Sequence, residues 1–89
     1  MNSRTTRQFR ELLARLPATV RHQAREAYRL FQANPGHPGL RFKQIHTPPP
    51  TYSARVGIGY RAVGVLGHGT VIWFWIGSHA DYDQLLTTL

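Results

Sequence analysis

The feature that most constrains this chain is a run of six large apolar residues, from Val71 to Ile76, which ends at Gly77. A strand that is apolar on both faces must be shielded from water on both. The run is therefore predicted to be a central strand of a sheet, or a strand that helices cover on one side. The rest of the fold has to be assembled around this segment.

The residues after the run predict a short helix. Ser78 can act as its N-cap, and Asp81 three residues later makes a variant of the capping box. An apolar stripe at helical spacing follows, formed by Tyr82, Leu85, Leu86 and Leu89. This helix would place His79 and Tyr82 on one face of its first turn. Free backbone N–H groups at such a helix start favour an anion such as phosphate.

The first third of the chain predicts a helical hairpin. Apolar residues recur at helical spacing in two stretches, first Phe9, Leu12, Leu13 and Leu16, then Val20, Ala24, Ala27 and Phe31. Pro17 separates the stretches and suits the first turn of a second helix. The segment ANPGHPG at 33–39 should end that helix.

The remaining segments predict four strands with short connections, at residues 40–46, 52–57, 60–66 and 71–77. Short connections join neighbouring antiparallel strands. We therefore predict an α+β fold in which the N-terminal helical hairpin packs on a four-stranded, mainly antiparallel sheet with a short C-terminal helix. Residues 1–89 are expected to form a single domain.

A chain of 89 residues buries only about 60% of the surface that its unfolded form exposes, so a partner that covers apolar surface would stabilise it. The absence of cysteine excludes disulfides and thiolate metal sites. The N-terminal residues lack the apolar segment of a secretory signal, and no apolar run approaches the roughly 18 residues of a membrane span. A cytoplasmic protein without membrane association is the expectation.

The charge balance is strongly basic. The chain has 11 Lys+Arg against 4 Asp+Glu, a net charge of +7, and Lys43 is its only lysine. The forked guanidinium of arginine binds phosphate through two hydrogen bonds. The excess therefore indicates a nucleic acid or an acidic protein as partner. A solvated, arginine-rich surface is the alternative.

Three stretches, in this order, resemble the RelE/ParE superfamily of type II toxins: NPGHPGLRFK, YSARVG followed by YRA, and WIGSHADYD. The resemblance extends from about Phe9 to Leu86. It implies a small basic toxin that pairs with a cognate antitoxin, and it implies no metal and no cofactor. The RelE-like branch of this superfamily cleaves messenger RNA, commonly on the ribosome, whereas the ParE-like branch inhibits DNA gyrase.

We predict from this resemblance a metal-independent, ribosome-associated mRNA endoribonuclease that inhibits translation. Its partners would be the antitoxin, mRNA and the ribosome, with DNA reached only through the antitoxin. Two alternatives remain open. One is a non-enzymatic gyrase inhibitor of the ParE type, and the other is an inactive toxin that retains only antitoxin binding.

Metal-free RNA cleavage uses the ribose 2′-hydroxyl as nucleophile, so the protein must move protons and stabilise charge on the phosphoryl oxygens. If 57–59 is a three-residue hairpin loop, Arg55 faces Arg61 across the strands. Two opposed like charges are destabilising unless an anion lies between them, which favours a phosphate clamp. A two-residue loop would shift the pairing and remove this argument.

The acid–base candidate is His79, because imidazole titrates near neutrality. The resemblance supports it, since HigB-like relatives also carry histidine at this place. Tyr82 can stack on a base or share in proton transfer, but its place in the leucine stripe fits a core position equally well. Trp73 and Trp75 are predicted to be core residues on one face of the last strand.

The resemblance also implies phosphate contacts from the first predicted strand, with Lys43 and Arg41 as candidates. The alternative for Lys43 is an edge-strand lysine that discourages aggregation. No chemistry is assigned to the other four histidines, of which His46 is the best placed to approach the RNA. The predicted catalytic set is therefore His79, Arg61, Arg55 and Tyr82, and the phosphate-binding set is Lys43, Arg41, Arg55 and Arg61.

Overall fold

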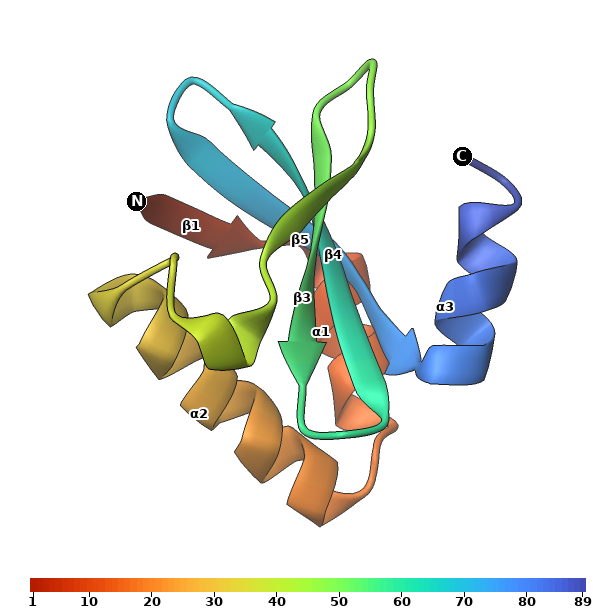
Figure 1. The fold of residues 1–89 in the computed structure, drawn as a ribbon. Coiled ribbons are helices and arrows are strands. Elements are labelled where there is room, and N and C mark those ends of the chain that lie inside the picture. The colour runs from red at the N-terminus through yellow and green to blue at the C-terminus, as the bar shows by residue number, and fades with distance from the viewer.

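The computed structural model describes residues 1–89 as three α-helices, one 3-10 turn and five strands (Figure 1). In chain order these are β1 (Asn2–Thr5), α1 (Arg7–Ala14), α2 (Ala18–Ala33), η1 (Pro38–Leu40), β2 (Lys43–His46), β3 (Thr51–Val56), β4 (Tyr60–Gly67), β5 (Thr70–Ser78) and α3 (His79–Leu86). The predicted α+β succession is confirmed, with one strand added before the first helix.

The sheet has five strands in the order β1-β5-β4-β3-β2. Strands β2 to β5 form the predicted antiparallel meander, whereas β1 pairs in parallel with β5, from Asn2 beside Thr70 to Thr5 beside Trp73. The prediction of four strands is therefore wrong. β1 is four polar residues, NSRT, without apolar alternation. β1 pairs with β5 through backbone hydrogen bonds, which do not depend on the side chains, so the sequence carries no pattern that predicts this strand.

The apolar run occupies β5, which lies between β1 and β4 as a central strand. This prediction is confirmed. α1 packs on β5 and α2 packs on β3, both on the same side of the sheet (Figure 1). Helix α1 starts after Thr6, whose Oγ1 accepts a hydrogen bond from the backbone N–H of Phe9 at 3.1 Å. Helix α2 starts after Pro17.

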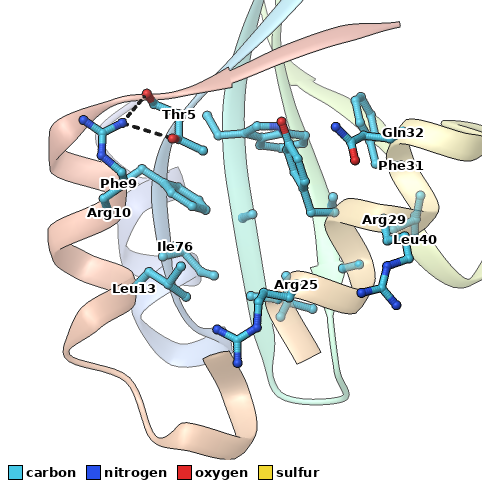
Figure 2. A pocket seen from close by; sticks show the side chains of 17 residues that line it. Thr5, Phe9, Arg10, Leu13, Arg25, Arg29, Phe31, Gln32, Leu40 and Ile76 are labelled. Carbon is cyan, nitrogen blue, oxygen red and sulfur yellow. Dashed lines mark hydrogen bonds between the residues drawn. The ribbon is translucent and has the colours of Figure 1, made fainter. Parts of the chain in front are cut away.

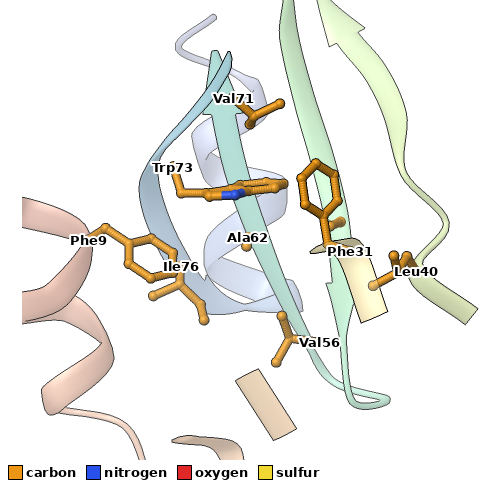
Figure 3. Packing of buried hydrophobic residues seen from close by; sticks show 9 residues of the cluster. Phe9, Phe31, Leu40, Val56, Ala62, Val71, Trp73 and Ile76 are labelled. Carbon is orange, nitrogen blue, oxygen red and sulfur yellow. The ribbon is translucent and has the colours of Figure 1, made fainter. Parts of the chain in front are cut away.

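The two helices lie on the sheet with a cavity of about 500 Å³ between them (Figure 2). Beneath them the buried apolar side chains form one cluster on what we call the helix-covered face of the sheet (Figure 3). At its centre, Trp73 meets Phe31 edge to face, with 5.4 Å between ring centroids. The cluster consists of Phe9, Phe31, Leu40, Ala54, Val56, Ala62, Val71, Trp73 and Ile76.

The β3–β4 turn is the three-residue loop on which the phosphate-clamp argument depends. Val56 pairs with Tyr60, and Arg55 pairs with Arg61. Gly57 has φ of +58°, a left-handed conformation that glycine adopts without steric cost. The register predicted for a three-residue loop is therefore confirmed.

A β-bulge in β5 separates the two tryptophans. Val63 pairs with Trp75 and Gly64 pairs with Trp73, which leaves Phe74 as the extra residue. Trp73 points to the helix-covered face and is 4% exposed, whereas Trp75 shares the opposite face with Val63 and is half-buried. The prediction that both indoles lie on one face is wrong, because a bulge reverses the alternation of side chains after it.

The first predicted strand, 40–46, is shorter in the structure and begins at Lys43. A 3-10 turn, η1, occupies the preceding residues and ends at Arg41, which has φ of +47° and so breaks the extended backbone. None of the helices is both long enough and apolar enough to cross a membrane.

Candidate functional site

The face of the sheet opposite α1 and α2 carries three of the predicted phosphate-binding residues. Lys43 pairs with Ser53 across β2 and β3, and Arg55 pairs with Arg61 across β3 and β4. Paired residues point to the same side of a sheet, and residues two apart on a strand do so too. Lys43, Arg55 and Arg61 therefore share one side, which we call the basic face.

The two arginines of the clamp differ in what holds them. The Nε of Arg55 donates a hydrogen bond of 2.9 Å to the carbonyl oxygen of Gly57, in its own turn. The guanidinium carbon of Arg61 lies 5.9 Å from the centroid of the Tyr82 ring, and its Nη1 is buried without a hydrogen-bond partner. A buried guanidinium N–H without an acceptor is costly, so an anion that accepted this hydrogen bond would be favoured.

His79 is the first residue of α3, next to the end of β5. Its backbone N–H donates to the carbonyl oxygen of Gly59 at 2.8 Å, which ties the helix start to the β3–β4 turn. Its side chain is 52% exposed, and Nδ1 lies 3.4 Å from the Oδ2 of Asp83 one turn along. The imidazole therefore reaches solvent close to the β3–β4 turn, with a carboxylate that can orient it.

The start of α3 is capped as predicted. The Oγ of Ser78 accepts a hydrogen bond of 3.2 Å from the backbone N–H of Asp81. With His79 bonded to Gly59, two of the first-turn N–H groups are already engaged. The structure therefore leaves less of this helix start free for a phosphate than the sequence suggested.

Tyr82 lies inward, at 6% exposure. Its ring is 5.9 Å from the His79 ring and 6.4 Å from the Trp75 ring, measured between centroids. Trp75 itself lies over Gly77, because a Cβ on that glycine would come within 2.7 Å of the indole. The packing favours the core position for Tyr82 over stacking on a base, and its ring joins His79 and Arg61 into one cluster.

Of the two phosphate-binding candidates on the first predicted strand, the structure places only one on the basic face. Lys43 is exposed on the edge strand β2 and faces the basic side. Arg41 is also exposed but precedes β2, after the 3-10 turn, so no strand register places it on the basic face. His46 pairs with Thr51 and its Nε2 lies 3.1 Å from the carbonyl oxygen of Pro48, at the far end of the same face.

Two residues of the basic face were not among the sequence candidates. Arg4 pairs with Ile72 and adds an exposed arginine at the β1 edge; it could not be placed because β1 was not predicted. Ser53 is fully buried between Lys43 and Val63 in the strand order, and its Oγ has no partner. The available signal for Ser53 was its place two positions before Arg55, which puts both side chains on the same side of the strand.

The fold and this face define a small basic α+β protein whose cationic side chains gather on one side of the sheet. The family model of the ParE-like toxin domain matches residues 18–84, and the chain belongs to this family. The resemblance to the RelE/ParE superfamily is thereby confirmed. No curated protein sequence matches the chain significantly.

Solved structures of RelE toxins share the fold. The RelB–RelE antitoxin–toxin complex of Methanococcus jannaschii is similar at 18% identity and a TM-score of 0.72, over 91% of this chain and 95% of that one. The RelBE2 toxin–antitoxin complex of Mycobacterium tuberculosis is similar at 24% identity and a TM-score of 0.68, over 88% and 96%. The archaeal RelE–RelB complex of Pyrococcus horikoshii is similar at 15% identity and a TM-score of 0.70, over 86% and 92%.

Proposed function

We propose that this toxin is a metal-independent endoribonuclease that cleaves mRNA on the ribosome and is held inactive by a cognate antitoxin. The observation that carries the proposal is the opposed pair Arg55 and Arg61, in the predicted register, with Arg61 and the exposed His79 both packed against the ring of Tyr82. The guanidinium of Arg61, which lies 5.9 Å from the centroid of the Tyr82 ring, supplies the charge and the hydrogen-bond donors for a phosphoryl oxygen.

In this reaction the 2′-oxygen of the ribose attacks the adjacent phosphorus and the bond to the 5′-oxygen breaks. A proton leaves the 2′-hydroxyl and another reaches the departing 5′-oxygen, which yields a 2′,3′-cyclic phosphate and a 5′-hydroxyl end. His79, which packs against Tyr82 on the same cluster as Arg61, is the side chain assigned to these proton transfers. Arg55 and Arg61 stabilise the charge that develops on the phosphoryl oxygens.

No aspartate or glutamate lies on a strand of the sheet, so the site has few acid–base groups. Such a sparse set suits an enzyme whose substrate is positioned by something else. Correct positioning alone is worth several kcal/mol of activation free energy in favourable cases. The ribosome, which holds mRNA codon by codon, would supply it.

The antitoxin is proposed for two reasons. The three RelE structures with the same fold are complexes with their antitoxins. The net charge of +7, gathered partly on one sheet face, also calls for an acidic partner. An acidic segment laid over Arg55 and Arg61 would block the site by occupying it.

The experiment that tests the enzyme is cleavage of a defined mRNA by purified toxin, with and without ribosomes, for wild type, His79→Gln and Arg61→Ala. Both variants should lose cleavage while keeping the fold, and His79→Gln should also keep antitoxin binding. Arg15→Ala, at the C-cap of α1, is the matched control. A substrate with 2′-deoxyribose at the cleavage position should resist, because the nucleophile is missing. Cleavage of that substrate would refute the proposed chemistry.

A gyrase inhibitor is the second candidate, because the family model that matches residues 18–84 is ParE-like. Pulse labelling after brief induction separates the two. Early loss of protein synthesis that disappears with His79→Gln supports the endoribonuclease. Early loss of DNA synthesis, with equal toxicity from the variant, supports gyrase inhibition.

A further inference from the structure

The basic face continues well beyond the arginine pair, towards the end of the sheet that lies away from α3. There, one residue from each strand forms a row across the sheet. Arg4 pairs with Ile72, Ile72 with Val65, Val65 with Thr51, and Thr51 with His46. Paired residues point to the same side of a sheet, so the whole row lies on the basic face. We call it the distal row.

The distal row is separated from the arginine pair by the length of four residues. Thr51 lies four residues before Arg55 on β3, and Val65 lies four residues after Arg61 on β4. At a rise of about 3.3 Å per residue, the two rows are roughly 13 Å apart. Lys43, on β2, lies between them. A ligand that contacts both rows must therefore be an extended chain, longer than a single phosphate group.

The middle of the distal row is an open apolar surface. Ile72 is 41% exposed, and it is the only exposed large hydrophobic residue that lies on a strand. Its strand has a neighbour on each side, so the exposure does not come from an edge position. Helix α3 packs on β4 and β5 at their other end, where Tyr82 meets Trp75 (Figure 1). Ile72 and the half-buried Val65 beside it are therefore left uncovered.

The β1 end of the distal row carries an uncompensated positive charge. Arg4 is exposed and forms no ion pair, whereas Arg7 and Arg29 on the helices pair with Glu11 and Glu26. No strand of the sheet contains an aspartate or a glutamate, so nothing on this face offsets the charge of Arg4. A ligand of complementary charge is therefore an anion.

We propose that the distal row is a second nucleotide-binding subsite, in which Ile72 and Val65 contact a nucleobase and Arg4 contacts a phosphate. Both groups would belong to the single-stranded RNA that the arginine pair holds. The inference rests on the endoribonuclease proposed above and extends its contact with the substrate from one phosphate to a segment. A single strand offers unstacked bases and a phosphate at every step, whereas a duplex keeps its bases stacked. Every base has an apolar face, so this contact would not depend on sequence.

The length of RNA needed for tight binding tests the subsite. Fluorescence anisotropy with labelled 2′-O-methyl oligonucleotides, which cannot be cleaved because the 2′-hydroxyl is blocked, measures binding alone. Wild type should bind an octanucleotide at least roughly tenfold more tightly than a dinucleotide, which is too short to span both rows. Arg4→Ala should weaken octanucleotide binding about fivefold and dinucleotide binding less than about twofold. Arg25→Ala, an exposed arginine on α2 without an ion pair, makes the same change of charge and should affect both oligonucleotides equally.

A gain of affinity tests the base contact, because a merely structural defect would not produce one. Ile72→Tyr should strengthen octanucleotide binding about fivefold, since an aromatic ring stacks on a base better than a branched aliphatic side chain does. Tyrosine is also favoured in strands, so the fold should tolerate it. Leu30→Tyr on α2 is the matched control, because Leu30 is 39% exposed, and it should change the affinity less than about twofold. Equal effects of the two tyrosine substitutions would overturn the base contact.

The same measurements separate this inference from the proposed reaction. Wild-type toxin that binds the octanucleotide no more tightly than the dinucleotide would overturn the subsite. Cleavage that is lost in His79→Gln, together with unchanged octanucleotide affinity in Arg4→Ala, would keep the endoribonuclease and overturn the subsite. Octanucleotide binding that depends on Arg4, in a toxin that cleaves no RNA with or without ribosomes, would keep the subsite and refute the endoribonuclease.

Discussion

The two faces of the sheet are made by the same strands and have opposite characters. On β3, Ala54 and Val56 point under the helices, whereas Ser53 and Arg55 point the other way. The helix-covered face carries a continuous apolar cluster. The basic face keeps two polar atoms buried without partners, the Oγ of Ser53 and the Nη1 of Arg61, whereas the helix-covered face keeps one, the Nε1 of Trp73.

This difference separates stability from activity. The side chains of the apolar cluster pack against one another and against α1 and α2, so the helix-covered face contributes mainly to stability. Unpartnered donors are satisfied only when something else arrives, which is the situation expected of a binding surface. Substitutions on the two faces should therefore have different effects, and their sizes can be ordered.

The largest effect should come from the core. Trp73→Ala removes the indole that Phe31 and Phe42 contact, so the free energy of unfolding should fall by about 3–5 kcal/mol in urea denaturation. Trp75→Ala, on the basic face, should cost less than half as much because Trp75 is half-buried. If both variants lost the same free energy of unfolding, the two faces would contribute equally to stability, contrary to this prediction.

The next effect should appear in activity alone. His79→Gln keeps a polar side chain at the start of α3 but cannot exchange protons, so the cleavage rate should fall by roughly 100-fold or more. The melting temperature should stay within a few degrees, because the side chain is half exposed. His22→Gln, an exposed histidine on α2, is the control and should keep full activity.

Ser78→Ala should affect both quantities to a smaller extent. It removes the acceptor for the backbone N–H of Asp81, and an N-cap is worth about 1 kcal/mol. Fraying of the first turn would also displace His79, so the cleavage rate should fall with stability. Ser78→Asp, which can cap equally well, should restore stability; a failure to do so would mean that the cap is not what Ser78 provides.

The smallest effect should come from Lys43→Ala. The side chain is exposed on an edge strand, so urea denaturation should not change. If it contacts a phosphate, the slope of log affinity for single-stranded RNA against log salt should fall by about 0.7. An unchanged slope, equal to that of Arg7→Ala on α1, would assign Lys43 to the alternative of protecting the sheet edge.

Most of the fold followed from features that repeat along the chain. Helical spacing predicted α1 and α2, turn residues delimited the meander, and a continuous apolar run predicted the central strand. Two features of the fold could not be predicted, because one depends on a single residue and the other on backbone hydrogen bonds alone. β1 carries no apolar pattern, and Phe74 looks like any other residue of an apolar run although it is the bulge that reverses Trp75.

The parts of the candidate site that depend on strand pairing or on helix capping could be predicted from the sequence. The three-residue turn placed Arg55 opposite Arg61, and the Ser78 cap placed His79 beside Tyr82. Burial was harder to predict, because Tyr82 fits a stacking site and a core equally well until its neighbours are known. Ser53 and Arg4 required the partner strands to be known first.

The bulge at Phe74 has a practical consequence for spectroscopy. The chain has two tryptophans, and the bulge assigns one to each side of the sheet. In a Trp75→Phe variant the indole emission comes from Trp73, in the apolar cluster beneath α1 and α2. In a Trp73→Phe variant it comes from Trp75, beside Tyr82. Fluorescence titrations with antitoxin and with RNA can thus follow each surface of this toxin separately, in solution and without an added dye.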